Sequence, residues 1–143
     1  MAALQKTIDC IREFNRFYTV RLGFLDQNYL GTGYSITEMR ILFEINASGG
    51  VNAKTLSDRL RMDKSYISRL VRSMEQRGLL LRKVSKSDRR SFDLYLTQTG
   101  QDEMARLISA THANIQKIVA PFDAKEQEAL CQAMTFIMEK LSK

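Results

Sequence analysis

The sequence is poor in the residues on which most enzyme and metal sites depend. Of its 143 residues, one is histidine, His112, and two are cysteine, Cys10 and Cys131. A metal site with several histidines is therefore excluded, and a Ser-His-Asp or Cys-His arrangement would have to use His112. The cysteines lack the spacing of metal ligands, so we expect reduced thiols. We predict no catalytic residues, no metal and no cofactor, and hence a protein that is not an enzyme.

One further activity stays open at Cys10, because reactive thiolates can respond to peroxide. The sequence places no basic residue directly beside Cys10, and small thiols on apolar helix faces are commonly buried. We therefore expect that Cys10 is not a redox sensor. Glycine-rich phosphate loops are missing too, since Gly31 and Gly33 lack the strand, the spacing and the lysine of a nucleotide loop.

Long apolar runs are also lacking. The longest ones are far shorter than a membrane span, and the N-terminal segment MAALQKTIDCIREF reaches charged residues too early for a signal peptide. We therefore expect a cytoplasmic protein with no membrane partner. At 143 residues, 44% hydrophobic and 27% charged, the chain fits a single domain, residues 1–143, with a workable core.

What the sequence does have is a concentrated positive charge. Residues 51–96 contain 12 Lys and Arg against 5 Asp and Glu, a balance of +7, whereas the remainder holds 10 basic and 11 acidic residues. The whole formal excess of +6 thus lies within one internal third of the chain. Such a distribution is expected of a surface that binds phosphates. An ordinary solvated basic face is the alternative.

Capping signals place three helices in and before this basic segment. Ser35 with Glu38 forms a capping box that opens the first, and glycines at 49 and 50 close it. Asn52 and Asp63 can each cap a further helix, and Gly78 ends the last one. A strand, a basic turn and a second strand follow. A helix pair can occupy the major groove of DNA while a cationic hairpin reaches the backbone or the minor groove, so this order predicts a module that binds double-stranded DNA.

The third of these helices has one apolar and one cationic face. We expect Ile67, Leu70, Val71 and Met74 to face inward, which leaves a polar stripe on the opposite side. Arginine can pair bidentately with guanine, serines reach phosphates or bases, and a tyrosine can stack on sugar or touch a thymine methyl. The candidate DNA-binding residues here are Lys64, Ser65, Tyr66, Ser68, Arg69 and Arg72, together with Asn52 and Lys54 of the preceding helix. An ordinary solvent face is the alternative interpretation.

The predicted hairpin has its charge at the tip. Leu79 to Val84 and the alternating run Phe92 to Leu96 are typical of paired strands. Between them lies KSDRRS, a tip that suits a narrow, negative minor groove better than the protein's own core. We predict that Asp88 orients an arginine rather than touching DNA. The candidate DNA-binding residues of the hairpin are Lys86, Asp88, Arg89 and Arg90.

Long helices are expected at both ends of the chain. The first, from about Leu4 to Leu25, is apolar on two faces, so we expect it to pack against its own domain and against a second chain. Thr99 opens another helix that the only proline, Pro121, ends, and Asp123 with Glu126 caps the last. We therefore predict a homodimer in which these terminal helices form the dimerisation bundle.

The segment that begins at Ser35 closely resembles the MarR family of bacterial winged-helix transcription regulators. It ends with the run MDKSYISRLVRSMEQRGLLLRKVSKSDRRSFDLYLTQTG. The Asp-x-Arg signature of the family's wing stands at Asp88 and Arg90. The resemblance implies that residues 64–72 belong to the recognition helix and that Arg90 enters the minor groove. The expected fold is mainly α, a winged helix-turn-helix with a small β-hairpin wing. Residues 35–97 would form the DNA-binding lobe, and residues 1–34 and 98–143 the dimerisation helices.

The resemblance also implies a repressor that a small-molecule effector releases from a pseudo-palindromic operator. Effectors of this family are often anionic aromatic compounds, which cations and rings would bind where the dimerisation helices meet the lobe. Candidate effector-binding residues are Arg16, Phe17, Tyr34, Arg40 and His112, although core aromatics and surface cations are the simpler interpretation of each.

The segment IREFNRFYTVRLGFLDQNYL further resembles MarR domains that precede an acetyltransferase domain. Because the sequence ends at Lys143, we do not carry acetyltransferase activity over to this chain. A regulator that acts alone is expected. The alternative is a regulatory or interaction module of a longer MarR-acetyltransferase parent protein.

Overall fold

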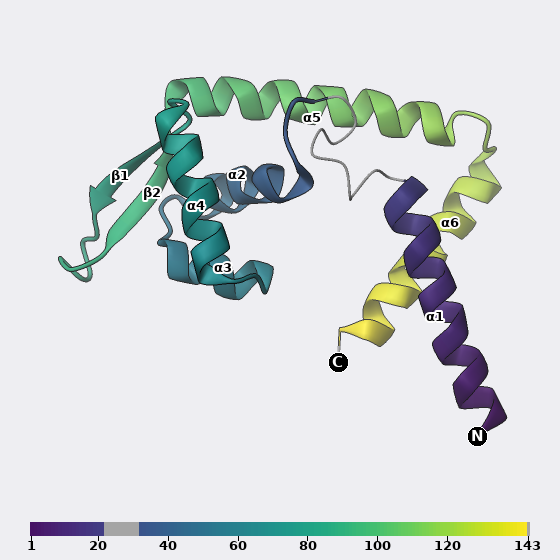
Figure 1. The fold of residues 1–143 in the computed structure, drawn as a ribbon. Coiled ribbons are helices and arrows are strands. Elements are labelled where there is room, and N and C mark those ends of the chain that lie inside the picture. Colours follow the sequence, from purple (N-terminus) through teal and green to yellow (C-terminus); the bar gives the residue numbers. More distant parts are fainter. Residues whose placement is uncertain (22–31, 143) are drawn as a thin grey trace. The chain divides into compact units, whose positions relative to one another are not determined.

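The structure is a computed structural model that describes residues 1–21 and 32–142. These residues form a mainly helical fold with one small sheet, which confirms the predicted fold class (Figure 1). Two compact units, residues 1–108 and 109–143, divide the chain, and each is described by itself. The elements in order are α1 (Ala2–Arg21), α2 (Ile36–Ser48), α3 (Ala53–Leu60), α4 (Lys64–Gln76), β1 (Leu80–Val84), β2 (Phe92–Leu96), α5 (Gln98–Val119) and α6 (Ala124–Leu141).

Side-chain caps set the start of α2, α3 and α4, as the sequence predicts. The Ser35 hydroxyl accepts a hydrogen bond from the Glu38 amide at 3.2 Å, and the Glu38 carboxylate accepts one from the Ser35 amide at 2.9 Å. The Asn52 side chain caps α3 by accepting from the Thr55 amide at 2.8 Å. Asp63 caps α4 in the same manner. Each cap satisfies an amide that the first helical turn leaves without a partner.

The predicted start of α5 is slightly too late. The sequence suggests that Thr99 opens this helix, but the Thr97 hydroxyl accepts a hydrogen bond from the Gly100 amide at 3.0 Å and α5 begins at Gln98. Thr97 is held in turn by the hairpin, because its amide donates to the Leu79 carbonyl at 3.0 Å. The end of the hairpin therefore fixes where α5 starts.

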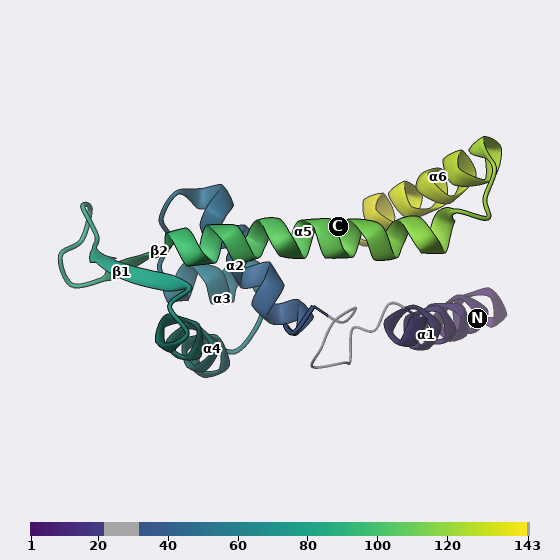
Figure 2. The ribbon, with the colours of Figure 1, turned by 90° about the horizontal axis from the view of Figure 1, so that it is seen from above.

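The hairpin is attached to the helices by a third extended segment. β1 and β2 pair antiparallel with Leu80 opposite Leu96 and Val84 opposite Phe92. Val51, between α2 and α3, forms an isolated bridge with Leu94, with hydrogen bonds of 3.3 and 2.8 Å in the two directions. This bridge ties the base of the hairpin to the start of α3, and the rest of the hairpin projects beyond the helices (Figure 2).

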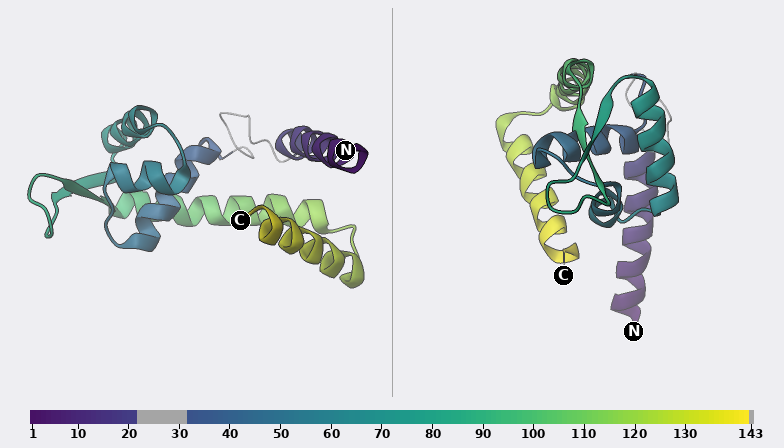
Figure 3. Two further views of the ribbon diagram at one scale, coloured as in Figure 1. Left: turned by 90° about the horizontal axis from the view of Figure 1, so that it is seen from below. Right: turned by 90° about the vertical axis from the view of Figure 1, so that its left-hand side faces the viewer.

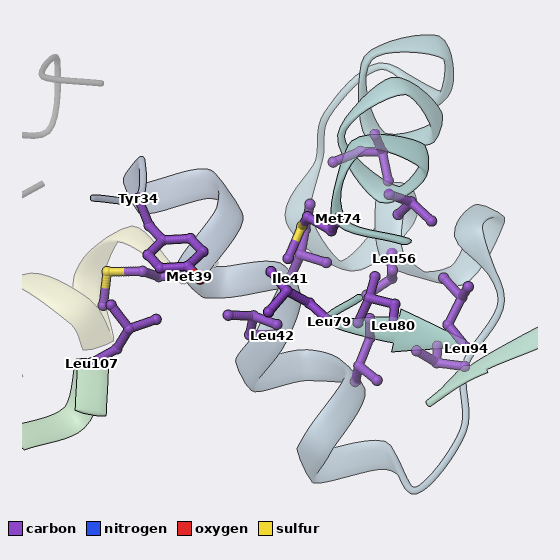
Figure 4. Packing of buried hydrophobic residues seen from close by; sticks show 14 residues of the cluster. Tyr34, Met39, Ile41, Leu42, Leu56, Met74, Leu79, Leu80, Leu94 and Leu107 are labelled. Atoms are coloured by element: carbon purple, nitrogen blue, oxygen red, sulfur yellow. The ribbon is translucent and has the colours of Figure 1, made fainter. Parts of the chain in front are cut away.

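One hydrophobic core holds α2, α3, α4, the hairpin and the first part of α5 together. Ile41, Leu42, Leu56, Ile67 and Val71 are fully buried within it. Figure 4 shows Leu107 of α5 beside Tyr34 and Met39 at one end of this cluster, with Leu94 at the other. The positions of α4 and of the hairpin are therefore set by a shared core, which we call the lobe core.

Helices α1 and α6 have no buried residues in the single chain. Apolar side chains are exposed along both, among them Phe14 and Phe17 of α1 and Phe136 and Met138 of α6. The predicted end of the first helix, at residues 22–25, lies outside the described residues. Within residues 1–21 and 32–142, no helix combines the length and the hydrophobicity needed to cross a membrane.

Candidate nucleic-acid interface

Helix α4 buries one face in the lobe core and presents the other to solvent. Ile67, Val71 and Met74 are fully buried, and the helical period then places residues 64, 65, 68, 69 and 72 on the outer side. Of these, Lys64, Ser65, Arg69 and Arg72 are exposed and Ser68 is half-buried. The Arg69 guanidinium lies 5.8 Å from the centre of the Tyr66 ring. The face predicted from the sequence is thus the face that the fold leaves open.

Three other arginines in and around the basic segment are engaged by the protein itself. Arg59 pairs with Glu44 at 3.3 Å, Arg77 with Glu38 at 2.7 Å, and Arg82 with Glu75 at 2.7 Å. These ion pairs link α2, α3, α4 and β1 to one another. By contrast, no ion pair of the described residues involves Lys64, Arg69, Arg72, Lys86, Arg89 or Arg90. The fold therefore separates cations that hold the lobe together from cations that are available to a ligand.

The tip of the hairpin is ordered by hydrogen bonds of its own. The Asp88 carboxylate accepts from the backbone amide of Arg90 at 3.0 Å, and the Asp88 carbonyl accepts from the Ser91 amide at 3.1 Å. Asp88 thus holds the backbone amide of Arg90, and the role of Asp88 in orienting an arginine rather than touching DNA stays a prediction. Lys86, Arg89 and Arg90 are all exposed around this turn.

The candidate DNA-binding residues of three elements meet at one pocket of about 340 Å³. Asn52 and Lys54 come from the start of α3, Lys64 from the start of α4, and Asp88 from the hairpin. Figure 3 shows α4 beside the hairpin when the lobe is seen from the hairpin end. Ser91 and Phe92 also line this pocket, and neither is among the site residues predicted from the sequence.

Tyr34, a candidate effector residue, lies in the lobe core with only 4% of its surface exposed. Its hydroxyl is 3.2 Å from the Glu103 carboxylate, and the guanidiniums of Arg77 and Arg106 lie 4.7 and 6.0 Å from the centre of its ring. Burial, reinforced by the Glu103 charge, raises the pKa of Tyr34. The Arg106 guanidinium donates to Glu103 at 2.6 Å and lowers the pKa of that carboxyl. The hydroxyl and the ring of Tyr34 are therefore already in contact with other side chains of the protein.

The other candidate effector residues are exposed. Arg40 lies on α2, Arg16 and Phe17 lie on α1, and His112 lies in the part of α5 that belongs to the second unit. Cys10 is exposed as well, which differs from the expected burial of that thiol on an apolar face. Among the described residues, no group of histidine, cysteine and carboxylate side chains could hold a metal ion.

Three helices, a short extended segment and a two-stranded hairpin, with a cationic outer helix face, define a winged helix-turn-helix. A comparison with protein families matches residues 34–92 to the MarR family. Residues 34–92 are therefore similar to the MarR family, and they fold as a winged helix-turn-helix. This match spans the helices α2, α3 and α4 and the hairpin up to the start of β2.

Individual proteins agree with this assignment. A proposed transcriptional regulatory protein for the hcr operon of Thauera aromatica is 30% identical over 57% of this chain and 49% of its own length. The match thus covers about half of that protein. The HTH-type transcriptional regulator SarZ of Staphylococcus saprophyticus is 29% identical over 83% of this chain and 74% of its own. The crystal structure of the transcriptional regulator BldR from Sulfolobus solfataricus shares the fold, with a TM-score of 0.75, 18% identity, and coverage of 98% of this chain and 99% of that one.

Proposed function

We propose that the protein is a sequence-specific, DNA-binding transcriptional regulator. The observation that carries this proposal is the open cationic surface made by the outer face of α4 and the hairpin tip. It holds six Lys and Arg side chains that no ion pair of the described residues takes up. The relatives described as transcriptional regulators add independent support.

In this proposal α4 lies in the major groove and the hairpin is the wing. Arg69 and Arg72 read base edges, whereas Lys64, Ser65 and Ser68 contact phosphates or bases near the start of the helix. Arg90 enters the minor groove, where a narrow groove concentrates negative potential. Lys86 and Arg89 then bind the phosphates on either side. These roles follow the exposed positions of the side chains.

The regulator acts as a homodimer on a pseudo-palindromic operator. Helices α1 and α6 support this, because helices with exposed phenylalanines along them require a partner surface. We assign residues 1–34 and 98–143 to dimerisation and residues 35–97 to DNA binding, in a protein that works in the cytoplasm.

The finer proposal is a repressor released by a small anionic aromatic effector. Arg16, Phe17, Arg40 and His112 are exposed and could serve that site, whereas Tyr34 would have to leave its present contacts.

Selection of bound fragments from genomic DNA tests the proposal. The wild-type protein should enrich fragments that share an inverted repeat with half-sites about 10 base pairs apart, as a symmetric dimer requires. A variant with Arg69, Arg72 and Arg90 all replaced by alanine should recover no such repeat while its circular dichroism remains helical. Recovery of the same random fragments by both proteins would contradict sequence-specific regulation.

A further inference from the structure

The pocket where α3, α4 and the wing meet combines cationic and aromatic side chains. Lys54 and Lys64 bring two ammonium groups to it, and Phe92 brings an exposed aromatic ring. A third cation in the lining, Arg82, is neutralised by Glu75 at 2.7 Å. The one carboxylate of the lining, Asp88, accepts a hydrogen bond within the wing turn. The pocket therefore has net positive charge beside an apolar surface.

The position of Phe92 is unusual for its side chain. Residues 92, 94 and 96 share one face of β2, since strand side chains alternate. Leu94 on that face is 1% exposed because it packs into the lobe core, but Phe92 is 47% exposed. The wing continues past the end of the lobe helices (Figure 2). Phe92 is the first residue of β2, at the end nearer the wing tip, and its side chain is largely uncovered. Its cross-strand partner Val84 is exposed too.

We propose that this pocket seats one sugar-phosphate unit of duplex DNA, with the Phe92 ring against the deoxyribose and the ammoniums of Lys54 and Lys64 on the phosphate. The inference rests on the proposed function and deepens it. A protein that places a helix in the major groove and a wing in the minor groove must pass one DNA strand between them. The pocket lies between these two elements, and a DNA strand alternates anionic phosphates with less polar sugars, as the pocket lining requires.

Phe92 is accordingly a positioning residue that sets the register of helix and wing on the DNA backbone. A sugar contact carries no base sequence information. It should therefore stabilise specific and random DNA equally, in contrast to a base contact from α4. The contact is apolar, so removing it should not change the number of counterions released on binding. These two properties separate it from the roles assigned to the arginines.

The test uses the full chain and a fluorescent mixed-sequence duplex of about 24 base pairs, long enough for two half-sites one helical turn apart. Anisotropy is measured between roughly 50 and 200 mM salt. Phe92→Ala should bind about fivefold to tenfold more weakly, since a half-exposed aromatic side chain becomes buried on binding, and its salt slope should stay at the wild-type value. Phe92→Tyr keeps the ring and should bind like wild type. Lys54→Ala should make the slope shallower by about 0.9 for each phosphate that is no longer neutralised.

Phe43→Ala is the matched control, because Phe43 is exposed to 43% on α2 and does not line the pocket. It should leave affinity and salt slope unchanged. Nuclear Overhauser effects between the Phe92 ring and deoxyribose protons give a readout that a merely structural role would not produce. Equal melting temperatures of the variants would show that the wing is intact.

Two results would contradict the binding of a sugar-phosphate unit in this pocket while leaving the proposed function in place. One is wild-type affinity for Phe92→Ala on a duplex that the wild-type protein binds. The other is a wild-type salt slope for Lys54→Ala, which would show that Lys54 neutralises no phosphate of the DNA. If the wild-type protein bound no duplex at all, the proposed function and the proposed role of the pocket would both be wrong.

Discussion

The hydroxyl of Tyr34 lies 3.2 Å from the carboxylate of Glu103, and this hydrogen bond joins residues 69 positions apart. Glu103 belongs to the first turns of α5, while Tyr34 precedes the capping box of α2. Arg77, directly after α4, lies over the Tyr34 ring and pairs with Glu38 at 2.7 Å. The start of α2, the end of α4 and α5 are thereby held by one polar cluster around Tyr34.

Replacing Tyr34 with phenylalanine should lower the free energy of unfolding by about 1 kcal/mol. The ring and its packing remain, but a buried hydroxyl no longer donates to a carboxylate. Urea denaturation followed by circular dichroism measures the change. Tyr66→Phe is the matched control, because Tyr66 is half-buried on the cationic helix α4 and lies outside the cluster around Tyr34. A destabilisation of the same size in both variants would contradict a special role for the cluster.

Stability should also depend on pH through Glu103. The Arg106 hydrogen bond lowers the pKa of Glu103 in the folded protein below its ordinary value. The unfolded chain therefore binds a proton before the folded one does as the pH falls. The contribution of Glu103 to the free energy of unfolding is complete above the ordinary pKa of a carboxyl group. It is lost as the pH falls through the lower pKa that Glu103 has in the folded protein. Glu103→Gln should flatten this acid limb in denaturation curves measured at several pH values, and an unchanged limb would show that other carboxylates dominate it.

Gly100 should not tolerate a side chain. It is buried in the first turn of α5, and a Cβ atom there would lie 2.2 Å from the carbonyl oxygen of Leu79. Alanine is favoured over glycine in a helix by roughly 1 kcal/mol, but the clash is with backbone that the hairpin fixes. Gly100→Ala should therefore destabilise the protein by about 1–3 kcal/mol in urea denaturation. Thr99→Ala is the control for helix propensity, because Thr99 is exposed in the same turn. A stabilised Gly100→Ala variant would mean that the backbone at Leu79 can move to make room for the methyl group.

The parts of the fold that follow from local sequence were predictable, and those that depend on distant contacts were not. The caps at Ser35, Asn52 and Asp63 act within three residues, so the sequence alone locates them. The bridge from Val51 to Leu94 joins positions far apart in the chain and gives no local signal. For the same reason the sequence does not reveal the hydrogen bond that holds Thr97 to Leu79, and with it the start of α5.

The candidate site divides in the same way. The outer face of α4 follows from helical periodicity, and Ile67, Val71 and Met74 on the opposite face are buried as predicted. Charge counts could not separate Arg82, which pairs with Glu75, from Arg72, which pairs with no carboxylate of the described residues. From the sequence alone, Tyr34 could be taken for an aromatic side chain that is free to contact a ligand. Its burial and its hydrogen bond to Glu103 depend on tertiary packing, which the sequence does not reveal. Pairing partners decide which basic residues remain available, and only the fold supplies them.

Arg69 should distinguish operator from random DNA. Its side chain is exposed in the middle of the outer face of α4, near the Tyr66 ring. If Arg69 pairs bidentately with a base, Arg69→Ala should weaken binding to an operator fragment by about 1–3 kcal/mol and relax preference at one position in each half-site. Binding to random DNA, measured by anisotropy in the same buffer, should change far less. Equal weakening on both kinds of DNA would instead assign Arg69 to a phosphate.

Arg90 should matter for DNA binding and hardly at all for folding. It is exposed at the wing tip, and its guanidinium forms no ion pair within the described part of the chain. Exposed charges of this kind contribute little to stability. Arg90→Ala should therefore weaken operator binding markedly while the unfolding temperature stays close to that of the wild type. The slope of log affinity against log salt should become shallower by about 0.9 for each phosphate that Arg90 neutralises, and by roughly twice that when both wings of a dimer are altered.

Asp88 provides the comparison that separates the charge of Arg90 from its position. The Asp88 carboxylate holds the Arg90 amide at 3.0 Å, so Asp88→Ala should loosen the wing turn without removing a cation. Removing a negative charge near DNA favours binding, whereas loosening the turn opposes it. We therefore expect Asp88→Ala to lose less affinity than Arg90→Ala and to keep the wild-type salt slope. Titrations of both variants on one operator fragment at several salt concentrations decide this. Wild-type affinity and slope for Arg90→Ala would mean that the wing does not engage DNA.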